Sequence, residues 1–234
     1  MASAPGSGST GAVILDFYGT LAEAVAWGPR LEDVLRVRGL TAPDDWGRST
    51  FDARDGHEHL EHSRSRDHYV AWERERLEAL ALACGAPRST LAALVDELYR
   101  ATKSFRLRVY DEVAEVLDDL ARSGVKLAVC SNWDWDLPDV LGSLGIAEPF
   151  DVIVTSARAG ARKPHPRIYA HTVEGLGVEP ARCLFVGDSR GPDVEGPTAH
   201  GMRAVLIRRS EGGGDGDGFT GPTLRTLAEL PAFL

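Results

Sequence analysis

The fold is decided by one stretch near the start of the chain, Ala12-Val13-Ile14-Leu15-Asp16-Phe17-Tyr18-Gly19-Thr20-Leu21. Four consecutive apolar residues after a Gly/Ser-rich start predict a strand buried on both faces, as in a parallel sheet. Asp16 then lies at the carboxyl end of this strand, where open α/β sheets bind their ligands. Gly19 allows a sharp turn and a close approach of backbone to a ligand. Because an apolar strand that ends in Asp is common, Asp16 needs support from elsewhere in the chain.

Three later stretches carry polar residues in a similar setting. They are Val129-Cys130-Ser131-Asn132, Lys163-Pro164, and Phe185-Val186-Gly187-Asp188-Ser189 followed by Asp193. The first and the last each end an apolar run with small polar residues, as the stretch at Asp16 does. The carboxyl ends of parallel strands meet at one edge of a sheet, so we expect these residues to face one crevice.

From residue 109 onward, apolar runs typical of strands alternate with segments of helical periodicity. We expect strands at Val125–Cys130, Asp151–Thr155, Cys183–Val186 and Arg203–Ile207, and helical segments at Asp111–Arg122, Leu137–Leu144, Pro166–Leu176, Val194–His200 and within Pro222–Leu234. Such alternation implies right-handed crossovers and a parallel sheet. The predicted fold class is therefore α/β, with a doubly wound, Rossmann-like parallel sheet as its core.

The segment between the first strand and residue 105 has a different pattern, with no convincing strand. Helices are expected at Arg30–Arg38, Arg66–Leu82 and Thr90–Thr102, separated by breaks that contain Gly and Pro. The sequence thus predicts three parts, which are a flexible tail at 1–10, an α/β core made of 11–21 and 105–234, and an inserted α-helical cap at 22–104.

The order of the motifs, a leading Asp, then Ser-Asn, Lys and a pair of Asp, resembles the haloacid dehalogenase-like hydrolase superfamily. The resemblance covers residues 12–21 and 109–207, with a helical cap inserted between them. It implies that Asp16 attacks phosphorus and forms an aspartyl-phosphate. A covalent nucleophile of this kind divides one difficult transfer into two easier ones.

Mg²⁺ is the cofactor that this resemblance implies. Its protein ligands would be Asp16, Asp188 and the backbone carbonyl of Tyr18, and Asp193 would support the ion or its waters. Oxygen ligands of this type are those that Mg²⁺ prefers, and the ion would compensate the charge of a carboxylate facing a phosphate.

The resemblance also implies which residues bind the phosphate group. Thr20, Ser131 and Asn132 are hydrogen-bond donors suited to phosphoryl oxygens. Lys163 would supply a positive charge to both the phosphate and the nucleophile. The predicted catalytic residues are therefore Asp16, Tyr18 and Lys163.

Tyr18 is the one departure from the family pattern. Family phosphatases carry a second Asp two residues after the nucleophile, which protonates the leaving alkoxide and then activates water. A phenol with an ordinary pKa near 10 is a poor base at neutral pH. The 2-haloacid dehalogenases also have Tyr here and need no metal, but they carry a Ser/Asn-rich fourth motif, whereas this chain has Gly-Asp-Ser at 187–189.

Three functions follow from this mixture of motifs. The leading one is a Mg²⁺-dependent phosphatase acting on a small phosphorylated metabolite. The alternatives are a 2-haloacid dehalogenase-type hydrolase and a catalytically impaired member that binds a ligand. A phosphonate-cleaving enzyme, which uses a cap lysine, is disfavoured because Lys103, at the edge of the cap, is the only lysine between residues 22 and 104.

Two further groups of side chains leave alternatives open. His57, His59 and His62 favour a solvated helix start over a zinc site, because no ligand spacing supports the metal. Trp133 and Trp135 directly follow the Ser-Asn motif, and they either line the pocket or pack between cap and core.

Composition and net charge limit the kinds of molecule that the chain is expected to bind. A net charge of −9 over 234 residues disfavours a nucleic-acid or anionic-membrane surface. No apolar run approaches the length of a membrane span, and the first ten residues lack the features of a signal peptide. Cys84, Cys130 and Cys183 are widely spaced, which fits a reducing cytoplasm. We expect a cytoplasmic enzyme with a small-molecule substrate, and the sequence leaves its oligomeric state open.

Overall fold

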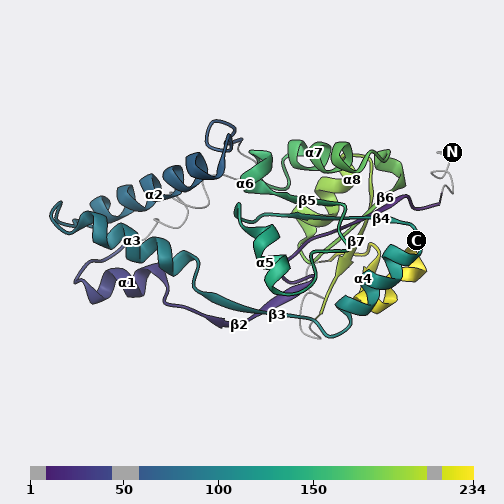
Figure 1. Ribbon diagram of the computed structural model, residues 1–234, viewed down its shortest axis with the longest axis horizontal. Helices are drawn as coiled ribbons and strands as arrows, with labels where there is room; N and C mark the ends of the chain where they lie inside the picture. Colours follow the sequence, from purple (N-terminus) through teal and green to yellow (C-terminus); the bar gives the residue numbers. More distant parts are fainter. Residues whose placement is uncertain (1–8, 44–57, 210–217) are drawn as a thin grey trace.

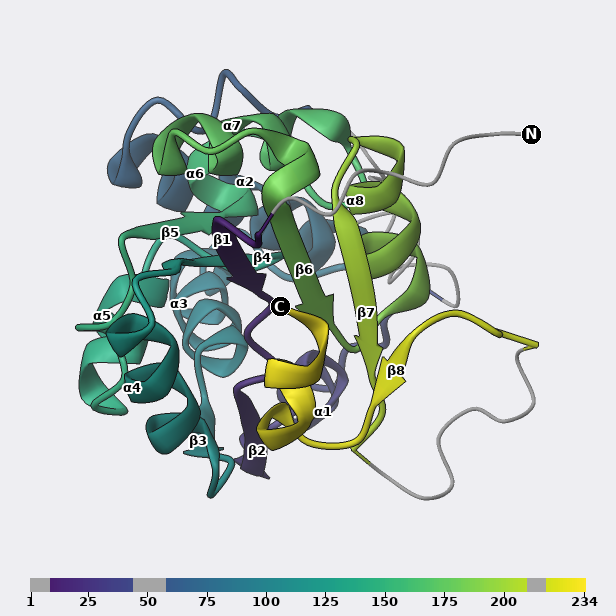
Figure 2. The ribbon, with the colours of Figure 1, turned by 90° about the vertical axis from the view of Figure 1, so that its right-hand side faces the viewer.

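The structure is a computed structural model that describes residues 9–43, 58–209 and 218–234. Most of the predicted flexible tail, and His57, lie outside the described residues. Six strands form the central sheet in the order β5-β4-β1-β6-β7-β8, and every neighbouring pair is parallel (Figures 1 and 2). The strands are β1 Ala12–Leu15, β4 Lys126–Ser131, β5 Val152–Thr155, β6 Cys183–Gly187, β7 Arg203–Ile207 and β8 Thr223–Leu224. The predicted α/β fold with a parallel sheet is confirmed.

Helices cover both faces of this sheet. They are α4 Val113–Arg122, α5 Leu137–Ser143, α6 Ser156–Ala159, α7 Pro166–Leu176 and α8 Gly196–Ala199, with shorter or tighter helical segments at Pro180–Arg182, Arg190–Glu195 and Leu227–Phe233. Val13 and Leu15 pack with α4, α5 and the last helical segment, whereas Ala12 and Ile14 pack with α7 on the opposite face. Burial on both faces explains why β1 is apolar without interruption.

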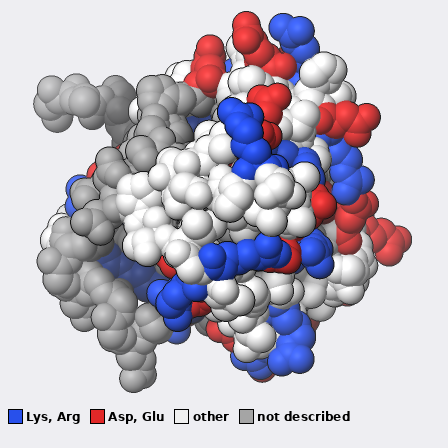
Figure 3. Space-filling model, turned by 90° about the vertical axis from the view of Figure 1, so that its left-hand side faces the viewer, with Lys and Arg blue, Asp and Glu red and all other residues white. Residues whose placement is uncertain are grey.

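Three helices form a separate group beyond the carboxyl edge of the sheet. These are α1 Leu31–Val37, α2 Arg66–Ala83 and α3 Leu91–Thr102, and they share a hydrophobic cluster of their own that includes Leu35, Leu77 and Leu94. In Figure 1 they extend from one end of the sheet. Seen from that end, the surface carries basic and acidic side chains interspersed around an uncharged area (Figure 3).

Two linker strands join these helices to the sheet. β2 Ala22–Trp27 and β3 Phe105–Val109 pair antiparallel with each other. The expectation that residues 22–104 contain no strand is therefore wrong. The two strands pair across a long separation in sequence, so local periodicity does not reveal them.

The end of the chain also differs from the expectation of one last helix. Thr223–Leu224 adds a sixth strand to the sheet, and Leu227–Phe233 forms a tight 3₁₀ segment that contains Pro231. Proline lacks an amide hydrogen and disfavours the interior of an α-helix. Among the described helices, none combines the length and apolarity needed to cross a membrane.

Candidate active site

The polar residues predicted for the site lie at the carboxyl ends of adjacent strands. Asp16 follows β1, Ser131 ends β4 and Asp188 follows β6, with β1 between the other two. The backbone N–H of Asp16 donates to the carbonyl of Val186 at 2.9 Å, which fixes the end of β1 against β6. The strand order reverses around β1, and such a switch point is where doubly wound sheets bind ligands.

Lys163 is the centre of the site. Its Nζ atom donates to Oδ1 of Asp16 at 2.7 Å and to Oδ1 of Asp193 at 2.6 Å. The residue is only 4% exposed. Burial by itself lowers the pKa of the ammonium group, but the charges of Asp16 and Asp193 outweigh burial and raise this pKa above its usual range. Lys163 therefore stays protonated at neutral pH.

Asn132 explains how Lys163 reaches the site from a distant loop. Its Oδ1 atom accepts from the backbone N–H of Lys163 at 2.7 Å, and its Nδ2 donates to the carbonyl of Lys163 at 3.0 Å. The side chain predicted to bind phosphate thus holds the Lys163 backbone by both of its polar atoms. A phosphate contact through the second hydrogen of Nδ2 stays a prediction.

Three carboxylates gather at the site, two of which hold the ammonium group of Lys163. Asp16, Asp188 and Asp193 each offer a ligand atom, and these atoms lie within 4.8 Å of one another. Asp193 is buried, and its Oδ2 atom accepts from the backbone N–H of Ser189 at 2.9 Å. Asp188 lies at the exposed rim of the site, and its pKa is raised first by partial burial and then by the charge of Asp16.

This acidic cluster has the charge and the donor atoms that a divalent cation requires. Asp16, Asp188 and Asp193 carry more negative charge than Lys163 compensates, and carboxylate oxygen is the ligand that Mg²⁺ prefers. Two glycines permit the close packing: a Cβ at Gly19 would overlap the carboxylate of Asp188, and a Cβ at Gly187 would overlap that of Asp193. The side chains therefore fit a Mg²⁺ ion. In the described parts of the chain this is the only His, Cys, Asp or Glu group of that kind.

The two hydroxyl donors predicted for phosphate are both buried beside these acids. Ser131 ends β4 and is 3% exposed. Thr20 is fully buried, and its Oγ1 atom has no hydrogen-bond partner among the described residues. A buried hydroxyl without a partner costs free energy, so this position favours a ligand that accepts a hydrogen bond from it.

Tyr18 occupies the position of the missing acid. It is 37% exposed, and its ring contacts the ring of Trp27 with 5.7 Å between centroids. Trp133, one of the two tryptophans with an open role, packs edge to face against Phe17 at 5.0 Å and near Phe105 at 5.4 Å. Trp135 lies near Tyr69 and under the guanidinium of Arg158.

Residues outside the motifs also shape the site, and no spacing pattern in the sequence pointed to them. Arg209 donates from Nε to the backbone carbonyl of Thr20 at 3.1 Å, and from Nη1 to Glu112 at 2.7 Å. Lys103 pairs with Asp134, in the loop after β4, and with Glu73 of α2.

The histidines near α2 are held by stacking. The rings of His59 and His62 stack on Trp72, with 5.3 Å and 4.8 Å between centroids. Burial lowers the pKa of His59 to about 4, helped by the charge of Arg162. These two histidines therefore pack around a tryptophan.

The fold is a Rossmann-like α/β fold, and its acidic residues gather at the carboxyl edge of the sheet, where enzymes of this fold class bind their ligands. A family model for haloacid dehalogenase-like hydrolases matches residues 10–201, and the chain belongs to this family. The predicted membership is thereby confirmed.

Individual relatives include both phosphatases and dehalogenases. The mouse haloacid dehalogenase-like hydrolase domain-containing protein 3 is 36% identical over 141 residues, which are 60% of this chain and 56% of the mouse protein. The (S)-2-haloacid dehalogenase of Xanthobacter autotrophicus is 32% identical over 208 residues, 85% of this chain and 75% of that protein. The crystal structure of a HAD phosphatase from Thermococcus onnurineus superposes with a TM-score of 0.58 at 26% identity, covering 95% of this chain and 96% of that one. The chain spans about half the length of the first curated relatives it matches.

Proposed function

We propose that this hydrolase is a Mg²⁺-dependent phosphatase of small phosphorylated molecules, with Asp16 as its covalent nucleophile. The observation that carries the proposal is the acidic cluster of Asp16, Asp188 and Asp193, whose ligand atoms lie within 4.8 Å of one another. A 2-haloacid dehalogenase needs no metal, so three acids gathered at one site favour phosphate chemistry. When bound, Mg²⁺ would neutralise part of the charge on the phosphoryl group.

The residues of the chain then divide the work of the reaction. Lys163 holds Oδ1 of Asp16, so Oδ2 is the oxygen that attacks phosphorus. An O–P bond forms to Asp16 while the P–O bond to the leaving group breaks, and the electron pair departs with the leaving oxygen. The hydroxyls of Thr20 and Ser131 donate to the phosphoryl oxygens. Water then cleaves the aspartyl-phosphate, which releases inorganic phosphate and restores Asp16.

We also propose that α1, α2 and α3 act as the cap of this site. Lys103, at the end of α3, pairs with Asp134 in the loop after β4, and Tyr69 of α2 donates its hydroxyl to the same carboxylate at 3.4 Å. These contacts tie the helices to the loop that follows Ser131 and contains Asn132. The cap thereby covers the side of the site from which a substrate enters.

Dehalogenation of a 2-haloacid is the second candidate function. Tyr18 favours it, because chloride leaves without a proton and the dehalogenases of the family also have Tyr here. The resemblance to the Xanthobacter enzyme, which extends over 85% of this chain, favours it as well. The two candidates differ in their need for metal and in the product that they release.

A substrate panel with and without Mg²⁺ separates these functions. Phosphate release from aryl, acyl and alkyl phosphates and halide release from 2-haloacids are measured in Mg²⁺ and in EDTA. We expect phosphate release that requires Mg²⁺ and disappears in Asp16→Asn, a nearly isosteric change. Asp139→Asn, which alters an exposed carboxylate on α5, is the matched control and should keep full activity.

The variant also has a readout that does not depend on turnover. Beryllium fluoride, a phosphate mimic, should bind the wild type in Mg²⁺ and fail to bind Asp16→Asn, while circular dichroism verifies that the variant is folded. Metal-independent halide release would instead establish the dehalogenase. Undiminished turnover in Asp16→Asn would remove this residue from the mechanism.

A further inference from the structure

Five aromatic rings form a continuous series of contacts beside the nucleophile. The series runs from Phe17 to Trp133, Phe105, Trp27 and Tyr18, with centroid separations of 5.0, 5.4, 6.2 and 5.7 Å. It begins and ends at two consecutive residues, Phe17 and Tyr18, which directly follow Asp16 in the sequence. The series therefore connects the turn after β1 with the linker strands β2 and β3.

The two ends of this series differ in their exposure. Phe17 is fully buried, whereas Trp27 is 64% exposed and Tyr18 is 37% exposed. Trp27 forms a cross-strand pair with Phe105, which accounts for its inner contacts but leaves most of the indole open to solvent. An exposed pair of large rings beside a reactive carboxylate is a site where a second planar group can stack.

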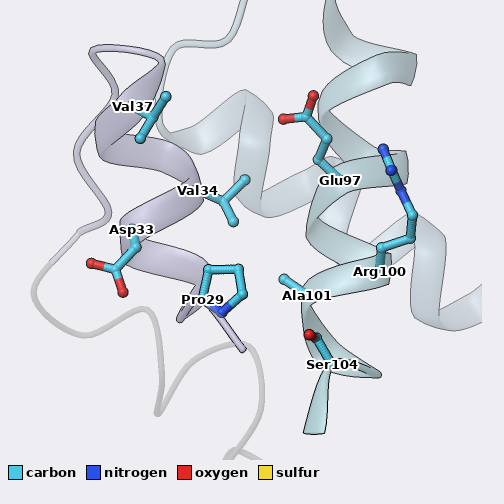
Figure 4. A pocket seen from close by; sticks show the side chains of 8 residues that line it. All are labelled: Pro29, Asp33, Val34, Val37, Glu97, Arg100, Ala101 and Ser104. Atoms are coloured by element: carbon cyan, nitrogen blue, oxygen red, sulfur yellow. The ribbon is translucent and has the colours of Figure 1, made fainter. Parts of the chain in front are cut away.

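A pocket adjoins Trp27, one of the two exposed rings. It has a volume of about 420 Å³ and is walled by Trp27 and Phe105, with Pro29, Leu31 and Thr102 among its other lining residues. A neighbouring groove of about 400 Å³ between α1 and α3 shares Pro29, Ala101 and Ser104 with it (Figure 4). The first of these two spaces is the one that Trp27 links to Tyr18, and through Tyr18 to the nucleophile.

The chemistry of the site calls for a leaving group of a particular kind. The ammonium group of Lys163 is committed to the carboxylates of Asp16 and Asp193, and Tyr18 stands where the family phosphatases have their acid. With no carboxylic acid at this position, the site favours a leaving oxygen that is stable as an anion and takes its proton from water afterwards. Phenols ionise near pH 10, as the tyrosine side chain does, so an aryloxide departs far more readily than an alkoxide.

We propose that Trp27 and Tyr18 bind the aromatic leaving group of the substrate, which makes the substrate a phosphate monoester of an aromatic alcohol. The inference rests on the proposed phosphatase function and adds the substrate class. Trp27 supplies the stacking face, and Tyr18 places that face beside the phosphoryl group on Asp16.

The test compares two phosphates that both have good leaving groups, of which only one carries a ring. The probes are 4-nitrophenyl phosphate and acetyl phosphate, with phenylphosphonate and methylphosphonate as inhibitors. We expect Trp27→Ala to lower the aryl-to-acetyl ratio of kcat/KM by about threefold to tenfold, mainly through KM, as loss of an aromatic pair predicts. The preference for phenylphosphonate should fall equally, and Trp27→Phe should restore both. Val25→Ala, at a 45% exposed position on the same strand, should leave both ratios unchanged.

The outcomes separate this inference from the function on which it rests. Hydrolysis of neither phosphate would overturn the proposed function and the inference with it. Hydrolysis of both, with ratios that Trp27→Ala does not change, would overturn the inference alone. A ratio that falls in Val37→Ala but not in Trp27→Ala would place the ring in the groove of Figure 4, which also contradicts the inference.

Discussion

Tyr18 is the residue that sets the leaving-group chemistry of this site. The other groups near the nucleophile are already engaged: Lys163 pairs with Asp16 and Asp193, and Asp193 also accepts from the N–H of Ser189. Because the pKa of Lys163 is raised, its ammonium group is a poor proton donor at neutral pH. Reactivity should therefore depend steeply on the leaving group.

Restoring the missing acid tests this dependence. In the wild type, an aryl or acyl phosphate should be cleaved far faster than an alkyl phosphate. Tyr18→Asp should narrow the gap, chiefly by accelerating the alkyl substrate, with a gain of at most about 10²–10⁴, the usual contribution of a positioned acid. The measurement is kcat/KM for both substrate types. Equal activity on both types before and after the change, in a folded protein that responds to Mg²⁺, would make Tyr18 a shape element of the pocket.

The turn after β1 is the element on which the site depends, and Arg209 holds it. The guanidinium group binds the carbonyl of Thr20 and the carboxylate of Glu112, and it stacks 3.6 Å from the ring centroid of Tyr110. Glu112 also accepts from the backbone N–H of Leu227 at 3.1 Å. Arg209 thus joins the turn after β1 to the start of α4, and Glu112 joins the start of α4 to the segment at Leu227.

Removing this guanidinium should cost both stability and turnover. We expect Arg209→Ala to lower the free energy of unfolding by about 1–3 kcal/mol, because the carbonyl of Thr20 and the carboxylate of Glu112 lose a partner in a mostly buried place. In urea unfolding, the free energy of unfolding of Arg209→Lys should lie between those of the wild type and Arg209→Ala, because lysine cannot donate two parallel hydrogen bonds as arginine does. Arg122→Ala, which removes an exposed guanidinium on α4, is the control. A loss confined to KM would contradict a role in positioning the turn.

The same variant should change the response to acid. Burial opposes ionisation of Glu112, but the hydrogen bonds that its carboxylate accepts, the strongest of them from Arg209, together with the charge of Arg209 outweigh burial and hold the pKa of Glu112 below its usual value. A carboxyl with a lowered pKa in the folded state contributes stability above its unfolded pKa, and this stability is lost as the pH falls. Without Arg209, that loss should begin at a higher pH, which acid unfolding followed by circular dichroism measures.

At the scale of the whole molecule, like charges are gathered at the carboxyl ends of the central strands. Asp16, Asp188 and Asp193 repel one another, and the chain as a whole carries a net charge of −9. A ligand that binds only the folded state raises the stability by mass action, by about 2.7 kcal/mol at a concentration one hundred times its Kd. Metal binding should therefore be visible in unfolding experiments.

We expect Mg²⁺ to raise the thermal midpoint above its value in EDTA. Asp188→Asn should weaken this response and raise the midpoint in EDTA, because the variant has one like charge fewer beside Asp16. NaCl at matched ionic strength separates specific binding from general screening, and Asp139→Asn should respond as the wild type does. A midpoint indifferent to Mg²⁺ and EDTA would count against the phosphatase and in favour of the dehalogenase.

The sequence alone determined the parallel sheet and the residues at its edge. Arg203–Ile207 and Pro166–Leu176 form within the bounds that their patterns predict, because apolar runs and helical periodicity are local signals. The polar residues that follow each strand were identifiable for the same reason. The family resemblance added their order, and the roles that it implies stay predictions for the experiments above.

Only the tertiary structure decided what joins distant segments. The ribbon of β2 and β3 exists because two segments on either side of α1, α2 and α3 pair with each other, and β8 exists because it pairs with β7. Two hydrogen bonds of the site likewise join residues far apart in sequence. Asn132 accepts from the backbone N–H of Lys163, and Arg209 donates to the carbonyl of Thr20. Such contacts depend on where the folded chain brings each backbone atom, and the local pattern of residues does not encode that position.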